Sequence, residues 1–434
     1  MARQNCPDSR DRVRRKFALC GLSALLWQAA LVIGAAPAAA DDAPASMFSF
    51  GGFGTLGLVH SDQRLADFTS STVEGAGAGR TRAWSPAVDS LFAVQVTANF
   101  TPKLSGVLQV VSEQNADSSF TPHVEWANLK YQFTPDCSVR VGRTALGVFL
   151  LADSRNIGFA YPWVRPPIEL YDLVSVTESD GIGLSYRLAV AGGSNTVELS
   201  AGVAHYDYPI ANTNTTDVAD SNRQLSLVDT YQRGFATLRL SYGQSQLTIP
   251  TLDPLFDGFR QFGPQGIGIA DLYEVNDRLI TFYGLSAAYE PGDWFVMAEW
   301  ARFDSHAVLG ETTGWYVSGG HRFGRATPYA TYAQTRADSN TSNPGLNVSG
   351  LPPELAAAAG ALNAGLNASL AAVASQRTFS LGTRIDVAQS VDLKLQWDRI
   401  SLGTNSQGWL TNAQPDFPRG SNLTVVSATV DFVF

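Results

Sequence analysis

The chain has 434 residues, of which 45% are hydrophobic and 16% charged, and its formal net charge is -9. This acidity argues against nucleic acid as a partner, because proteins that bind nucleic acid neutralise its phosphates with Lys and Arg. Of three cysteines only Cys137 lies beyond residue 40, so no internal disulfide is expected once that segment is removed.

The first forty residues have the pattern of a secretory signal peptide. Basic residues up to Lys16 precede an apolar run over 17–34, and an Ala-rich segment ends at Ala40. Cleavage there removes six basic and two acidic side chains and leaves a net charge of -13. The alternative is one membrane-spanning helix over 17–34. No such run follows, so we exclude a multi-helix membrane protein and predict a signal peptide over 1–40 and one domain over 41–434.

Apolar and polar residues alternate in many short segments from Phe48 onwards, which is the period of a β-strand. Tight turns such as Thr134-Pro135-Asp136 follow every second strand, and long polar loops follow the others. The mean hydropathy of -0.03 fits alternating faces. Sixteen strands are predicted, at residues 48–59, 92–100, 104 onwards, 127–133, 138–143, 182–188, 197–203, 236–242, 245–250, 285–289, 294–300, 315–323, 327–336, 379–385, 391–397 and 422–434.

The first strand contains a Gly-x-Gly-x-x-Gly string at 52–57. A dinucleotide site needs this string at a turn from strand to helix, whereas a polar loop follows here. The glycines therefore indicate bending or close backbone approach in an end strand. A second local pattern, rich in Ala and Leu up to Ala374, predicts a short helix within a long loop.

The last strand, 422–434, has one wholly apolar face that ends in Phe432 and Phe434. A strand of a soluble sandwich could alternate in the same way. Together with the export signal and the many similar strands, however, this terminal Phe resembles the signal of outer-membrane β-barrels of Gram-negative bacteria. The resemblance implies an all-β, transmembrane antiparallel barrel in which the last strand pairs with the first. Sixteen strands leave an aqueous channel, and closure avoids unpaired backbone groups in hydrocarbon.

The loop over 144–172 carries the densest set of charges and three prolines that stiffen its backbone. Its Arg-x-Gly-Arg at 140–143 and its Pro-Trp-x-Arg-Pro-Pro-x-Glu-x-Tyr at 162–171 resemble a family of porin-like channels from proteobacteria. Its position after the fifth strand resembles that of a loop in the general trimeric porins. In that family this loop folds inward and narrows the channel. The candidate constriction residues are Arg140, Arg143, Asp153, Arg155, Arg165, Glu169 and Asp172.

Opposing charges in a narrow aqueous neck set ion selectivity and orient dipolar solutes. The alternative is that the charges of this loop pair and fasten it to the barrel wall. Further along the chain, other charges fall in the inward phase of their strands. The candidate lumen-lining residues are Arg239, Glu299, Arg322, Arg384 and Lys394. Because bases predominate in this set, we expect a preference for anionic solutes.

Enzymatic function is not expected. The five histidines show no metal-ligand spacing, and no phosphate-binding loop is present, so neither a metal nor a cofactor is predicted. Ser286 lies within an alternating strand rather than at the turn of a nucleophile elbow. A lipase pairing of Ser286 with His205 remains the alternative, and absence of esterase activity in solubilised protein would exclude it.

These features predict an outer-membrane porin for passive diffusion of small hydrophilic solutes and ions. One alternative is a channel selective for small anionic solutes such as carboxylates, and another is a structural or adhesive surface barrel. The resemblance implies a homotrimer in contact with membrane lipid and lipopolysaccharide.

Overall fold

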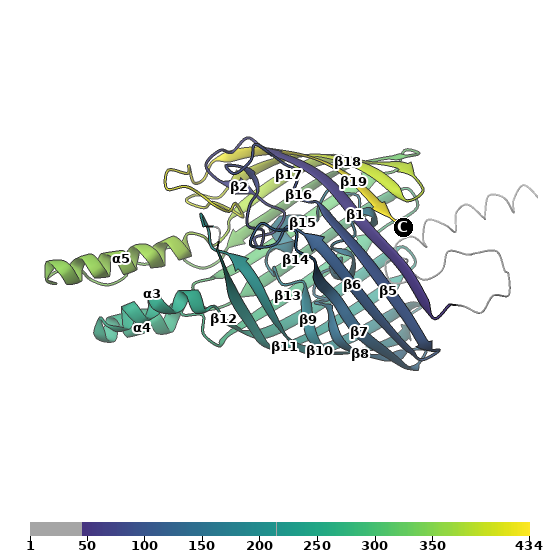
Figure 1. Cartoon of the computed structure of the whole chain (residues 1–434), viewed down its shortest axis with the longest axis horizontal. Coiled ribbons are helices and arrows are strands. Elements are labelled where there is room, and N and C mark those ends of the chain that lie inside the picture. The colour runs from purple at the N-terminus through teal and green to yellow at the C-terminus, as the bar shows by residue number, and fades with distance from the viewer. Residues whose placement is uncertain (1–45, 214) are drawn as a thin grey trace, which may run out of the picture.

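The computed structural model describes residues 46–213 and 215–434, so the predicted signal peptide lies outside the described part. Sixteen long strands form an antiparallel barrel in which each pairs with its neighbour in sequence, as Figure 1 shows. Its strands are β1 (Phe48–Ser61), β5 (Leu91–Thr101), β6 (Leu104–Glu113), β7 (His123–Thr134), β8 (Cys137–Ala145), β9 (Glu178–Val190), β10 (Gly193–Pro209), β11 (Thr216–Arg233), β12 (Ala236–Thr248), β13 (Arg278–Tyr289), β14 (Trp294–Asp304), β15 (Glu311–His321), β16 (Ala326–Ala337), β17 (Gln376–Ala388), β18 (Val391–Leu402) and β19 (Asn422–Val433).

Closure occurs between β1 and β19, as predicted from the last strand. Their register runs from Phe53 opposite Val433 to Ser61 opposite Val425. The glycines of β1 allow this approach: a Cβ added to Gly54 would lie 2.5 Å from Cζ of Phe432. A Cβ added to Gly52 would lie 2.5 Å from the carbonyl oxygen of Ala93 on β5, so the close backbone approach predicted for these glycines is confirmed.

The strand count of sixteen is correct, but two of its assignments were wrong. Segments 236–242 and 245–250 belong to one strand, β12, and β11 covers residues predicted to be loop. In β11 the register shifts between Asn222 and Leu225, and Arg223 has a positive φ of 49°. Such a bulge moves the residues that follow it to the opposite face of the sheet. The alternation of apolar and polar residues is therefore interrupted in this polar strand, and it was not recognised as a strand from the sequence.

The two faces of the wall differ as the alternation requires. Large apolar side chains such as Leu129, Val141 and Leu240 are exposed on the outer face, whereas polar ones such as Gln396 and Ser427 are buried inside. Exposed aromatics gather beside the short turns, among them Tyr289 and Trp294. This is the aromatic girdle of a barrel that spans a membrane.

The long loops lie at the opposite end of the barrel from the short turns. The first holds β2 (Asp67–Phe68), β3 (Ala78–Gly79) and β4 (Trp84–Ser85). Three helices, α3 (Asp253–Arg260), α4 (Gly263–Tyr273) and α5 (Pro353–Leu370), project from this end (Figure 1). α5 confirms the helix predicted in the Ala/Leu-rich segment. Among the described residues, no helix is both long and apolar enough to cross a membrane.

Candidate pore constriction

The loop between β8 and β9, residues 146–177, folds into the barrel. It contains η1 (Ala152–Ser154), η2 (Gly158–Ala160) and α2 (Ile168–Tyr171). The indole of Trp163 donates to Ser318 Oγ on β15 at 2.7 Å, and Val164 N–H donates to Gln396 Oε1 on β18 at 3.1 Å. These partners lie on the inner wall far from the loop in sequence, so the loop lies across the lumen.

Glu299 on β14 holds two parts of the loop. Its Oε1 accepts from the hydroxyls of Tyr171 and Tyr316 at 2.7 and 2.8 Å. Its Oε2 accepts from Leu150 N–H at 2.8 Å and from Ser286 Oγ at 2.6 Å. The side chain is buried, and both carboxylate oxygens are occupied. Glu299 therefore anchors the loop rather than lining open water.

Arg165, like Glu299, links the loop to the barrel wall, but from the loop side. Its guanidinium lies 2.7 and 2.5 Å from the two oxygens of Asp89, 3.5 Å from Asp398 Oδ2 and 2.6 Å from Ser427 Oγ. The side chain is only 7% exposed, and it stacks over the ring of Phe68. A cavity of about 30 Å³ lies between the loop and the wall beside Arg165. The charge of Arg165 is thus compensated and turned away from the channel.

Two more bases anchor the middle of the loop. Lys394 is fully buried; its Nζ lies 3.1 Å from Asp431 Oδ2 and donates to Gly158 O at 2.5 Å. Arg384 pairs with Asp392 at 3.0 Å and donates to Phe159 O at 2.6 Å. Both residues were predicted to line the lumen. They hold η2 against the wall near the closing strand.

Glu169 lies in α2 and is buried. Its carboxylate accepts from Gln376 Nε2 at 2.7 Å and from the hydroxyl of Thr378, while its carbonyl accepts from Thr335 at 2.5 Å. Burial raises the pKa of Glu169, and the two hydrogen bonds to its side chain oppose that rise. This acid fastens α2 to β16 and β17.

Arg155 and Asp172 face each other within the loop. Arg155 Nη2 lies 3.7 Å from Asp172 Oδ1, and the guanidinium lies 5.8 Å from the ring centre of Tyr171. Burial raises the pKa of Asp172 to about 7, although the charge of Arg155 opposes the rise. Asp153, in η1, is half-buried. The Asp172 carboxyl is therefore a group of this loop that titrates near neutrality.

We expect docking of the loop to weaken as the pH rises from about 4 to about 7. Asp172 binds its proton more tightly in the docked loop than in water, so its contribution to stability is present at low pH and is lost as pH passes its raised pKa. Open-channel noise in planar bilayers should therefore increase across this range and then level off. Asp172→Asn should flatten the profile, and Asp153→Asn should leave it unchanged; a flat wild-type profile contradicts the prediction.

The contacts described above place the loop against β12 to β19 and, through Ile157, against β1, β5 and β6. The inner faces of β8 to β11 and the short-turn half of β7 carry no such described contact. Lys130 and Arg140 lie directly opposite each other on this open wall, and the exposed Glu198 follows on β10. Lys130 and Glu198 were missing from the predicted site, although the same alternation places them inside.

Three further predicted residues lie elsewhere. Arg239 on β12 donates to the carbonyls of Gly147 and Phe149 and so supports the start of the loop. Arg143 falls in the outward phase of β8 and pairs with Asp180 at 2.7 Å. Arg322 lies in the exposed turn after β15. Of the predicted residues, Arg140 lies on the wall that the loop does not contact, and Asp153 and Arg155 are partly exposed on the loop itself.

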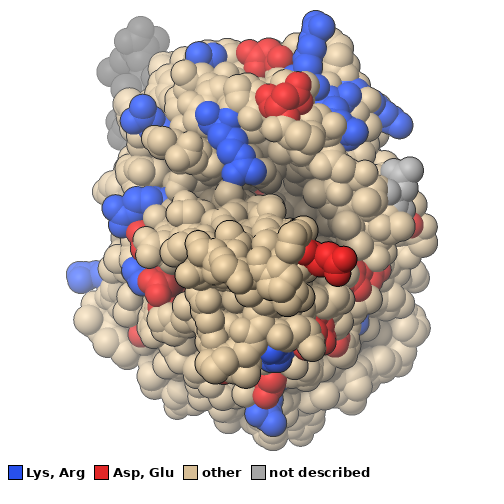
Figure 2. Space-filling model, turned by 90° about the vertical axis from the view of Figure 1, so that its left-hand side faces the viewer, with Lys and Arg blue, Asp and Glu red and all other residues tan. Residues whose placement is uncertain are grey.

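Figure 2 shows the end of the molecule from which the helices project. A hollow lies between the upper part of this face, where several Lys and Arg side chains gather, and uncharged surface beneath it. The charges at this entrance are thus unevenly distributed around the rim.

Residues 28–341 match the model of a family described as Gram-negative porin. Among solved structures, the anion-selective porin from Comamonas acidovorans is 12% identical with a TM-score of 0.52, covering 89% of this chain and 99% of its own. DcaP, an outer-membrane channel of Acinetobacter baumannii, is 10% identical with a TM-score of 0.51, covering 89% and 97%. No curated protein sequence matches the chain. The match to the family model covers well over half of the sequence, so the chain belongs to the Gram-negative porins and is an outer-membrane channel for passive diffusion.

Proposed function

We propose that small hydrophilic solutes pass between the inward loop and the wall formed by β7 to β11, and that this path prefers anions. The observation that carries the preference is the cross-strand pair of Lys130 and Arg140. Neither base has an ion-pair partner among the described residues. Like charges directly opposite each other destabilise a sheet, so such a pair is best explained by a task in the channel.

The other bases of the neck contribute less to this preference. Arg165, Lys394 and Arg384 are each paired with acids at the wall. Charges compensated in this way produce only a weak field in the water beside them. The unpaired bases on β7 and β8 therefore dominate the potential that an ion meets.

Acidic groups of the neck supply the opposite sign. Glu198 is exposed on β10, and Asp153 lies on the loop. Separated charges of opposite sign create a transverse field that orients dipolar solutes. A neck of this kind admits many small solutes. A more specific alternative is a channel that is selective for small carboxylates.

Replacement of Lys130 and Arg140 by Met should shift the reversal potential in a salt gradient towards cation preference. The reason is that both positive charges leave the open wall while the loop keeps its anchors. Lys103→Met is the matched control, because Lys103 lies in an exposed turn at the barrel end. An unchanged reversal potential in the double variant would refute the anion preference.

Liposome swelling separates the remaining alternatives. A general porin admits neutral sugars and carboxylates according to size, whereas a carboxylate channel shows saturable uptake of carboxylates.

The assembly and processing also belong to this proposal. Residues 1–40 act as a cleaved export signal, the long loops face the cell exterior, and three copies associate within membrane lipid and lipopolysaccharide. The exposed apolar outer wall supports contact with both lipid and neighbouring copies.

A further inference from the structure

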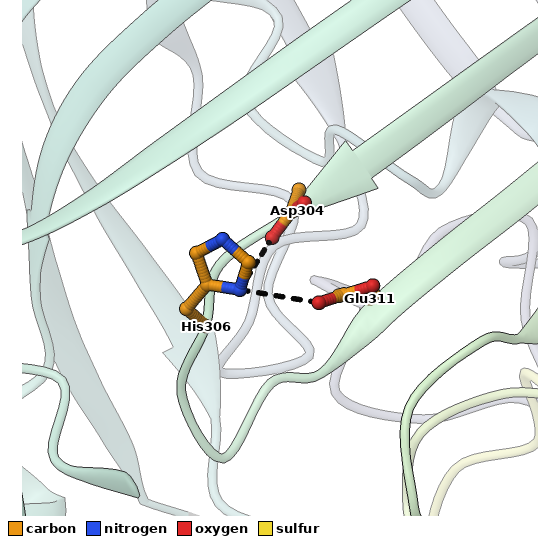
Figure 3. A group of neighbouring side chains, drawn as sticks. All are labelled: Asp304, His306 and Glu311. Atoms are coloured by element: carbon orange, nitrogen blue, oxygen red, sulfur yellow. Dashed lines mark ion pairs between the residues drawn. The ribbon is translucent and has the colours of Figure 1, made fainter. Parts of the chain in front are cut away.

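We propose that Asp304, His306 and Glu311 bind a divalent transition-metal ion such as Zn²⁺ at the turn between β14 and β15 (Figure 3). One ligand atom from each residue lies within 4.8 Å of the others. His306 Nδ1 is 3.2 Å from Asp304 Oδ1 and 3.1 Å from Glu311 Oε1. One imidazole nitrogen with two carboxylate oxygens is a donor set that suits zinc.

The two carboxylates are held together by the sheet. Asp304 is the last residue of β14, Glu311 is the first of β15, and they form a cross-strand pair. Directly opposed like charges are destabilising unless a cation compensates them. Arg302 supplies one positive charge, at 2.5 Å from Glu311 Oε2 and 3.8 Å from Asp304 Oδ2. The other oxygen of each carboxylate is left facing His306.

The inner oxygen of Asp304 lacks the hydrogen-bond partner that a buried carboxylate oxygen requires. Asp304 Oδ1 is buried, and no hydrogen bond reaches it from the described residues, even though the imidazole nitrogen is close. A metal ion coordinated by that oxygen would satisfy it. The side chain of His306 is 73% exposed, so water can complete the coordination sphere.

Nearby groups do not remove the need for a cation. Asp338 lies 3.4 Å from Arg302 Nη1 and 2.7 Å from Arg336 Nη2, so Arg336 compensates its charge. Asp304 and Glu311 then share Arg302 and retain a net negative charge with neutral His306. The competing explanation is a protonated imidazole that pairs with both acids, and this state binds no metal.

The turn that carries His306 also supports the projecting helices. Ala307 and Val308 are buried in the same apolar cluster as residues of α3, α4 and α5. Val308 N–H donates to Tyr273 O at the end of α4 at 3.0 Å. A bound ion would therefore brace the turn on which this helical group packs.

The test is calorimetric titration of ZnCl₂ into the full processed protein in detergent, freed of metal beforehand, at pH 7.5. Wild type should bind Zn²⁺ at this site, and His306→Gln should weaken that binding by more than about tenfold. The variant is folded if its unheated and heated samples migrate differently on a denaturing gel, as those of the wild-type barrel do. Asp304→Asn removes a second metal ligand and should weaken Zn²⁺ binding to the same extent.

Two matched controls distinguish this site from other histidines. His205 lies beside a single acid, Asp220, and His123 lies 3.5 Å from Glu125 and 3.7 Å from Glu113. His205→Gln and His123→Gln should bind Zn²⁺ with the wild-type affinity at the site that His306→Gln weakens. The proposal is overturned if wild type binds no Zn²⁺, if His306→Gln binds as wild type does, or if only CaCl₂ produces binding.

Discussion

Arg165→Met should raise single-channel conductance and open-channel noise while leaving ion preference nearly unchanged. The substitution keeps the length of the side chain but leaves Asp89 and Asp398 buried without their cation. Removal of one partner from a buried ion pair costs about 3–5 kcal/mol. That cost falls on the docked loop, so the loop should leave the wall more often and widen the path. Planar-bilayer recordings measure both quantities.

Arg140→Met is the matched comparison, since Arg140 stands on the open wall and pairs with no acid in the described part of the chain. It should change the reversal potential and leave the noise at the wild-type level. The two variants thus separate an anchoring role from a selectivity role. If Arg165→Met instead shifts the reversal potential strongly and leaves the open-channel noise at the wild-type level, then Arg165 determines ion selectivity and does not anchor the loop.

Glu299→Leu should release the loop at a second point. Four donors lose their acceptor: the hydroxyls of Tyr171, Tyr316 and Ser286, and the N–H of Leu150. A buried donor without a partner costs about 1–3 kcal/mol. We expect cleavage of the loop by added protease in folded, detergent-solubilised barrels, where the wild-type loop resists.

Glu198→Gln provides the control, because Glu198 is an exposed acid on the open wall. It should leave protease resistance unchanged. Glu299→Gln should have an intermediate effect, since its amide retains one accepting oxygen but places an NH₂ group against donors. Equal resistance of wild type and Glu299→Leu would mean that other contacts suffice to hold the loop.

Much of the fold follows from the sequence, because alternation and turn chemistry act over a few neighbouring residues. The closing strand, the glycines of β1 and the position of the inward loop were all readable in this way. β11 was missed because a bulge at Arg223 breaks its period. The split assignment of β12 compensated for that loss, and the count of sixteen was correct for this reason.

The sequence alone determined that charged residues would collect in one loop and on inward faces. Only the tertiary structure decided which of them meet water. Arg165 and Asp398 are 233 residues apart, and Lys394 meets the carbonyl of Gly158 across 236 residues. Likewise Asp304, His306 and Glu311 converge only because β14 and β15 pair in this register. Burial and pairing depend on such distant contacts, and local pattern carries no information about them.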